Sequence, residues 1–100
     1  MEKELYISIG DHLDHAKPGK LFGKPCYKVN GKAFMCFFQN EIVCKLGGEL
    51  HTKALNLEGA HLFDPSGKKR PMKEWIQIPF THKHMWKKFA ESSLIYVRNK

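Results

Sequence analysis

Apolar and β-prone residues concentrate between Pro25 and Leu46, where two short turn signals interrupt them. Asn30-Gly31 separates the first two runs, and both residues tolerate the positive φ that a two-residue type I′ turn requires. A second break at Gln39-Asn40 returns the chain into Ile42 and the residues after it. The pattern therefore predicts a three-stranded antiparallel meander over residues 25–46.

Two-residue turns would set the pairing of these strands. Cys26 would then lie opposite Met35, and Met35 opposite Cys44. In that register Cys26 and Cys44 share one face, roughly 10 Å apart and beyond disulfide reach, while Cys36 points to the other face. We interpret all three cysteines as buried, reduced thiols. The middle strand, Ala33 to Phe38, is apolar on both faces, so we expect cover on both, by helices or by a second copy of the chain.

Three amphipathic segments are predicted to form helices around the meander. The first covers residues 1–16 and repeats apolar residues every four positions, with Gly10 weakening its helical propensity. The second covers about residues 49–57 and stops at Gly59. The third covers about residues 82–98, with Thr81 as its N-cap.

Two further strands are predicted near residues 61–64 and 72–78, joined through the turn Asp64-Pro65-Ser66-Gly67. Lys17 to Lys20 has the composition of a loop. The pattern as a whole predicts an α+β fold, in which an antiparallel sheet is flanked by N-terminal, middle and C-terminal helices. A length of 100 residues suits one domain spanning residues 1–100.

The charge is strongly basic, with 17 Lys and Arg against 10 Asp and Glu and a net charge of +7. Such a balance favours nucleic acid, anionic lipid or acidic protein surfaces. The basic residues are scattered from Lys3 to Lys100, which is more typical of a solubility feature than of a binding footprint. The candidate anion- or nucleic-acid-binding residues are Lys68, Lys69 and Arg70 in a turn, and Lys83, Lys87 and Lys88 on the last helix. The alternative interpretations are a solvated hairpin tip and a solvated helix face.

The sequence contains little that indicates a catalytic or metal-binding site. His82 and His84 would diverge on a helix, whereas His12 and His15 make a better-spaced pair if the first helix forms. The chain has no GxSxG, HExxH, CxxC or phosphate-loop motif, so we expect no enzyme, no bound metal and no cofactor. No apolar run reaches membrane-spanning length and no signal peptide is apparent, which predicts a cytoplasmic protein without a membrane partner.

Five stretches follow one another in a recognisable order: Leu21–Pro25, the hairpin Val29–Phe34, Phe63–Lys68, Arg70–Trp75 and the last helix with Trp86. Together they resemble the TfoX/Sxy N-terminal domain-like family, which is related in shape to YjbR-like proteins. The resemblance covers almost the whole chain and rests on structural motifs. It implies a bacterial α+β domain without established catalytic residues. TfoX regulators of natural competence carry an additional C-terminal helical domain, which we expect this chain to lack.

Three functions are consistent with these patterns. The first is a non-enzymatic regulatory or protein-interaction module, with a homodimer as one way to cover the second sheet face. The alternative is a basic nucleic-acid-binding protein, motivated by the net charge of +7 and by the two cation groups. The third is a metal or small-molecule binder, near the histidines or around Arg70 and Trp75.

Overall fold

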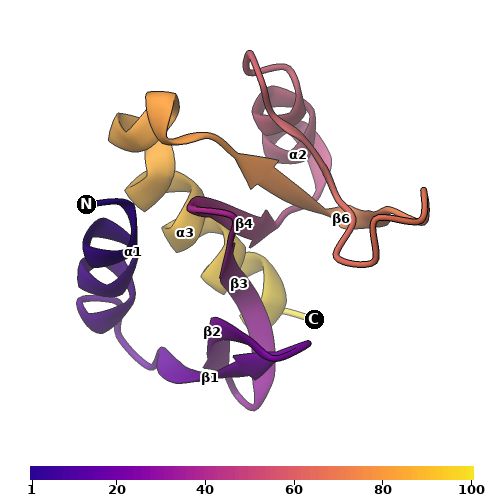
Figure 1. Ribbon diagram of the computed structural model, residues 1–100. Helices are drawn as coiled ribbons and strands as arrows, with labels where there is room; N and C mark the ends of the chain where they lie inside the picture. Colours follow the sequence, from indigo (N-terminus) through magenta and orange to yellow (C-terminus); the bar gives the residue numbers. More distant parts are fainter.

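The computed structural model describes residues 1–100 as one six-stranded antiparallel sheet packed against helices (Figure 1). The helical elements are α1 (Glu2–Asp11), α2 (Gly48–Leu55), α3 (Lys83–Arg98) and a short 3-10 turn, η1 (Phe80–His82). The strands are β1 (Lys17–Leu21), β2 (Lys24–Val29), β3 (Lys32–Phe38), β4 (Glu41–Lys45), β5 (His61–Phe63) and β6 (Met72–Ile78), in the sheet order β1-β2-β3-β4-β6-β5. The predicted α+β fold is confirmed.

Two-residue turns join the first four strands. Phe22-Gly23, Asn30-Gly31 and Gln39-Asn40 each place both residues at φ values between 52° and 78°, as type I′ turns require. The turns predicted at residues 30–31 and 39–40 are therefore confirmed. The prediction of a loop from Lys17 to Lys20 is wrong, because this segment forms most of β1. Pro18 is tolerated there because β1 is an edge strand, where a missing backbone N–H leaves no neighbour unpaired.

A bulge shifts the register between β2 and β3. Next to the Asn30-Gly31 turn the pairing follows the prediction, but Phe34 then has no partner and Cys26 pairs with Cys36 instead of Met35. Because β3 carries this one extra residue, the side chains of β2 that lie further from the turn fall on the opposite face from the one that an unshifted register predicts relative to β3. The prediction that Cys26 shares a face with Cys44 is therefore wrong, although the pairing of Met35 with Cys44 is confirmed.

All three α-helices pack on one face of the sheet. The main core contains 18 buried residues, which come from α1, α2 and α3 and from the facing sides of the strands. Its largest fully buried side chain is Trp86 on α3, whose indole N–H donates a hydrogen bond of 3.1 Å to the carbonyl oxygen of Pro79. No buried side-chain nitrogen or oxygen lacks a hydrogen-bond partner. This face is a conventional apolar core.

The opposite face carries no helix. Five buried residues cluster there, and none of them belongs to a helix: Cys26, Cys36, Val43, Phe63 and Trp75. The expectation that helices cover both faces is wrong, because the chain closes over this cluster with its own rings and lysine stems. Cover by a second copy of the chain stays a prediction. The ammonium groups of Lys24 and Lys45 lie 5.2 Å and 5.8 Å from the ring centroids of Phe38 and Trp75. We call this side the helix-free face.

The helix boundaries differ in detail from the predictions. α1 ends at Asp11 rather than near residue 16, while α2 lies where the middle helix was expected. Thr81 does not cap the last helix: it lies within η1, and His82 holds the N-cap position without a side-chain capping bond. None of the helices combines the length and the apolarity that crossing a lipid bilayer requires.

Candidate nucleic-acid interface

The charged residues divide unevenly between the two halves of the fold. The strands and the loops that join them directly, residues 17–45 and 61–78, hold ten Lys and Arg against three Asp and Glu. That difference equals the whole net charge of +7. The helices and their flanks, which make up the remaining residues, hold seven of each sign. The helical half is therefore electrically balanced, and the sheet half carries the positive field.

Strand alternation places several of these cations on the helix-free face. Residues two apart on a strand point the same way, so the neighbours of buried Cys26 on β2 and of buried Val43 on β4 share their side of the sheet. Lys17 on β1 lies opposite Lys28 on β2, so its side chain is on the same face. We call the four cations identified in this way the cationic sheet face: Lys17, Lys24, Lys28 and Lys45.

The three acidic residues of the sheet half are already engaged. Glu41 accepts a hydrogen bond of 2.7 Å from the side-chain amide of Gln77, and Asp64 accepts bonds within its own loop. Glu74 accepts a bond of 2.5 Å from the Tyr96 hydroxyl, and it lies 3.9 Å from the ammonium of Lys45. The other three members of the cationic sheet face form no ion pair. Their charge is therefore available to a ligand.

The loop between β5 and β6 holds the first predicted cation group, Lys68, Lys69 and Arg70, and all three residues are exposed. The Asp64 carboxylate accepts bonds of 3.1 to 3.2 Å from the backbone amides of Ser66, Gly67 and Arg70. The Ser66 hydroxyl and these amides hold the pKa of Asp64 below its ordinary value. These amides are therefore already bonded to the chain's own carboxylate, and the cationic side chains of the loop remain for a partner.

The second predicted group, Lys83, Lys87 and Lys88, lies on α3, which covers the other face of the sheet. The seven residues of β6 separate the β5–β6 loop from η1 and α3, a length of about 20 Å. In Figure 1 that loop lies at the right, across the molecule from η1 and the start of α3 at the upper left. The structure therefore does not join the two predicted groups. The loop that holds the first group connects Phe63 to Met72, which both pack in the cluster of the helix-free face.

Sequence reasoning missed the cationic sheet face, because its members are separated along the chain and carry no motif. A local signal exists in β2, where Lys24 and Lys28 flank Cys26 at alternate positions. That signal becomes useful only once the bulge at Phe34 shows which face Cys26 occupies.

A groove between α1 and α3 is the other surface feature. Two hollows of about 410 and 320 Å³ share Leu13 and Glu91. The apolar parts come from both helices, and Ile95 remains 47% exposed at one end. Lys83 and Lys87 line the larger hollow, while Lys88 is exposed elsewhere on α3. Charges of both signs border this groove, in contrast to the cationic sheet face.

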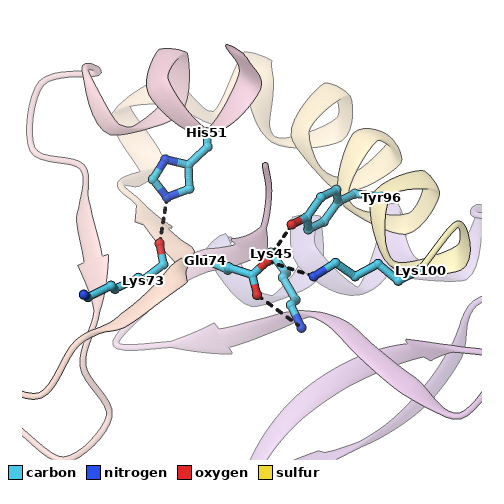
Figure 2. Close-up of polar contacts among 6 residues, drawn as sticks. All are labelled: Lys45, His51, Lys73, Glu74, Tyr96 and Lys100. Carbon is cyan, nitrogen blue, oxygen red and sulfur yellow. Dashed lines mark hydrogen bonds and ion pairs between the residues drawn. The ribbon is translucent and has the colours of Figure 1, made fainter. Parts of the chain in front are cut away.

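Figure 2 shows a polar cluster that ties the end of α3 to β6. The Glu74 carboxylate receives the Tyr96 hydroxyl and, at 2.9 Å, the ammonium of Lys100. These bonds lower the pKa of Glu74 from its ordinary value of 4.5, the Tyr96 bond contributing most. Nearby, His51 Nε2 lies 2.7 Å from the carbonyl oxygen of Lys73. The carboxylate is saturated with donors, so we interpret the cluster as structural.

The histidines do not assemble into a site. His12 Nδ1 lies 2.7 Å from the carbonyl oxygen of Ser8, and His82 Nε2 lies 2.8 Å from that of Glu58. Within residues 1–100 no three His, Cys, Asp or Glu side chains gather closely enough to hold a metal ion.

Comparison of the chain with models of protein families, with curated proteins and with solved structures finds no match. The resemblance to the TfoX/Sxy N-terminal domain-like family therefore stays a prediction.

Proposed function

We propose that this chain is a non-enzymatic nucleic-acid-binding protein that uses the cationic sheet face. The observation that carries the proposal is the segregation of charge: the sheet half accounts for the entire +7, while the helical half is neutral. Four cations of the sheet half, Lys17, Lys24, Lys28 and Lys45, lie on the face that has no helix over it. Several separate cations on one face suit a row of phosphates better than a single small anion.

Binding would work mainly through the phosphate backbone. Lysine ammonium groups that approach phosphates release condensed counterions, and this release gives affinity without base specificity. The rings beneath could add a second contribution. Lys24 covers the partly buried Phe38, so a lysine that turns toward a phosphate would uncover a ring on which a base can stack. The electrostatic part alone predicts a dissociation constant of roughly 10⁻⁴ to 10⁻⁶ M at physiological salt.

The test compares two triple variants by fluorescence anisotropy with a labelled DNA duplex of about 20 base pairs. Lys17→Gln, Lys24→Gln and Lys28→Gln together remove three charges that form no ion pair from the cationic sheet face. Each phosphate contact contributes about 0.9 to the slope of log K against log salt, so the slope should fall by about 2 to 3. Lys83→Gln, Lys87→Gln and Lys88→Gln remove the same charge from α3 and should leave the slope nearly unchanged.

The two triples are well matched as controls. Each removes three positive charges and one cation–π contact at 5.2 Å, that of Lys24 with the Phe38 ring in the first triple and that of Lys83 with the Phe80 ring in the second. Circular dichroism checks that both variants remain folded. No binding by the wild type at low salt, or equal losses in the two triples, would contradict the proposal. Poly-glutamate that competes as well as DNA of equal charge would point instead to an acidic protein partner.

The α1–α3 groove favours a second candidate, the protein-interaction module that forms a homodimer. Its support is the exposed Ile95 at one end of a groove of two adjoining hollows, which leucine and isoleucine side chains of both helices line in part. Sedimentation equilibrium of the wild type and of Ile95→Lys tests it. A concentration-dependent dimer that the variant abolishes would support this candidate, and a monomer at every concentration would contradict it.

A further inference from the structure

Two thiols face each other across neighbouring strands on the helix-free face. Cys26 on β2 and Cys36 on β3 are Cα partners in the sheet, and both are free and buried. They belong to the same five-residue cluster, whereas Cys44 belongs to the main core on the other face. We infer that Cys26 and Cys36 are a modification site, at which a hydroperoxide converts the two thiols to a cross-strand disulfide. This inference does not depend on nucleic-acid binding.

The sheet geometry determines how close the two residues approach. Phe38 and Glu41 flank a two-residue turn and therefore form a hydrogen-bonded pair, so the pairing of Cys36 with Val43 two steps away is hydrogen-bonded as well. The backbone N–H and C=O of Cys36 then point toward β4. Toward β2 Cys36 occupies a non-hydrogen-bonded position, where paired Cα atoms lie about 4.5 Å apart. That separation lies within the range of disulfides, which begins at about 4.4 Å.

Edge strand β1 provides the access route. Cys26 pairs with Gly19, which has no side chain to cover the sulfur. A Cβ placed on Gly19 would lie 3.6 Å from the Cys26 sulfur and 3.1 Å from Cε of Lys28, so the flexible stem of Lys28, and no side chain of Gly19, lies beside the thiol at this position. Edge strands open at a lower free energy than central ones, and a small oxidant needs only such a local opening. Cys36 lies one strand further in.

The same geometry assigns the order of events. Burial raises the pKa of both thiols, that of Cys36 to about 12, and the ammonium of Lys28 opposes the rise at Cys26. The Cys26 thiolate attacks one peroxide oxygen, the O–O bond breaks, and the displaced hydroxide or alkoxide takes up the thiol proton. The Cys36 sulfur then attacks the sulfenic sulfur of Cys26. The S–S bond forms, the S–O bond breaks, and hydroxide leaves with the Cys36 proton as water.

The experiment treats the folded full chain with hydrogen peroxide, blocks remaining thiols, and maps tryptic peptides without reduction. Cleavage places Cys26 in Leu21–Lys28, because Lys24 precedes a proline, and it places Cys36 and Cys44 together in Ala33–Lys45. The expected product is these two peptides joined, with the loss of two hydrogen atoms, both in the wild type and in Cys44→Ala. The disulfide closes the loop between Cys26 and Cys36, which should raise the Tm of the oxidised monomer by on the order of 10 °C. Reduction with dithiothreitol should reverse this increase.

A glycine variant tests the route while both thiols stay in place. Gly19→Ala puts a methyl group over the Cys26 sulfur at ordinary contact distance, and its nearest neighbour is the flexible end of Lys28. We expect it to slow disulfide formation several-fold, and an unchanged rate would overturn the assignment of Cys26 as the thiol that reacts first with the peroxide. Three outcomes would overturn the assignment of Cys26 and Cys36 as the disulfide pair. They are a link that disappears in Cys44→Ala, a disulfide that forms only between chains, and peroxide treatment that leaves all thiols free.

Discussion

Replacing Gly10 by alanine should destabilise the protein, although the same change stabilises most helices. Gly10 lies in the last turn of α1, and a Cβ at this position would come within 3.0 Å of three ring carbons of Tyr27 on β2. The ring cannot easily withdraw. Tyr27 is only 4% exposed. Its hydroxyl donates a hydrogen bond of 2.8 Å to the Asp11 carboxylate, and the same hydroxyl lies 3.3 Å from the carbonyl oxygen of Ile7. Glycine is therefore required by the close approach of helix and sheet.

The magnitude follows from two opposing effects. Alanine in place of glycine inside a helix gains about 1 kcal/mol from propensity. Overpacking a buried ring costs about 1–3 kcal/mol, and loss of the Tyr27 hydroxyl bond adds about 1 kcal/mol. The net effect is a loss of about 2 kcal/mol of unfolding free energy, which lowers the Tm of a chain of this size by roughly 10 °C.

Urea unfolding followed by circular dichroism measures the effect, and a double-mutant cycle with Tyr27→Ala supplies the control. Once the ring is gone, Gly10→Ala should become stabilising by a few tenths to about 1 kcal/mol, so the sign of its effect should reverse. A Gly10→Ala variant as stable as the wild type, or more stable, would refute the packing of α1 on β2.

Three further changes test other parts of the structure. The pKa of Glu74 is lowered in the folded state, so its contribution to stability is complete above the ordinary value of 4.5 and is lost as the pH falls through the folded value. Tyr96→Phe removes the hydrogen bond that contributes most to this shift, so it should flatten the acid limb of a plot of Tm against pH. An acid limb identical to that of the wild type would contradict this. Gly47→Ala places a Cβ 2.5 to 2.9 Å from the Tyr96 ring and hydroxyl, so chemical denaturation should show a loss of about 1–3 kcal/mol. Asp64→Asn keeps the size of the side chain but weakens its bonds to the amides of its loop, so hydrogen exchange at Ser66, Gly67 and Arg70 should accelerate while β3 and β4 remain protected.

The sequence predicted the elements whose signals are local. Asn30-Gly31 and Gln39-Asn40 tolerate positive φ between β-prone runs, which is enough to place the turns of the meander. The edge strand β1 was missed because Pro18 and Gly19 look like loop residues. Nothing in the composition shows that a neighbour, here β2, supplies the pairing. The sequence alone marks Gly10 as a weak point of a helix, whereas the structure shows that the close approach of the Tyr27 ring, which is distant in sequence, requires glycine there.

The bulge at Phe34 was beyond prediction for a different reason. Every residue from Ala33 to Phe38 is apolar, so a shift by one position moves no polar side chain into the core and leaves no trace in the pattern. That single shift decides that Cys26 lies beside Cys36, and that Lys24 and Lys28 share the face of Phe38 and Val43. The candidate interface and the thiol pair both depend on it, and so neither could be found from the sequence alone.

Amide chemical-shift mapping during titration with a short DNA duplex tests the central claim most directly. If the cationic sheet face binds nucleic acid, the largest shifts should fall on β1, β2, β4 and the β5–β6 loop, and they should fade as salt is raised. Shifts confined to the α1–α3 groove, or spread evenly over both halves of the fold, would contradict a binding surface created by the separation of charge.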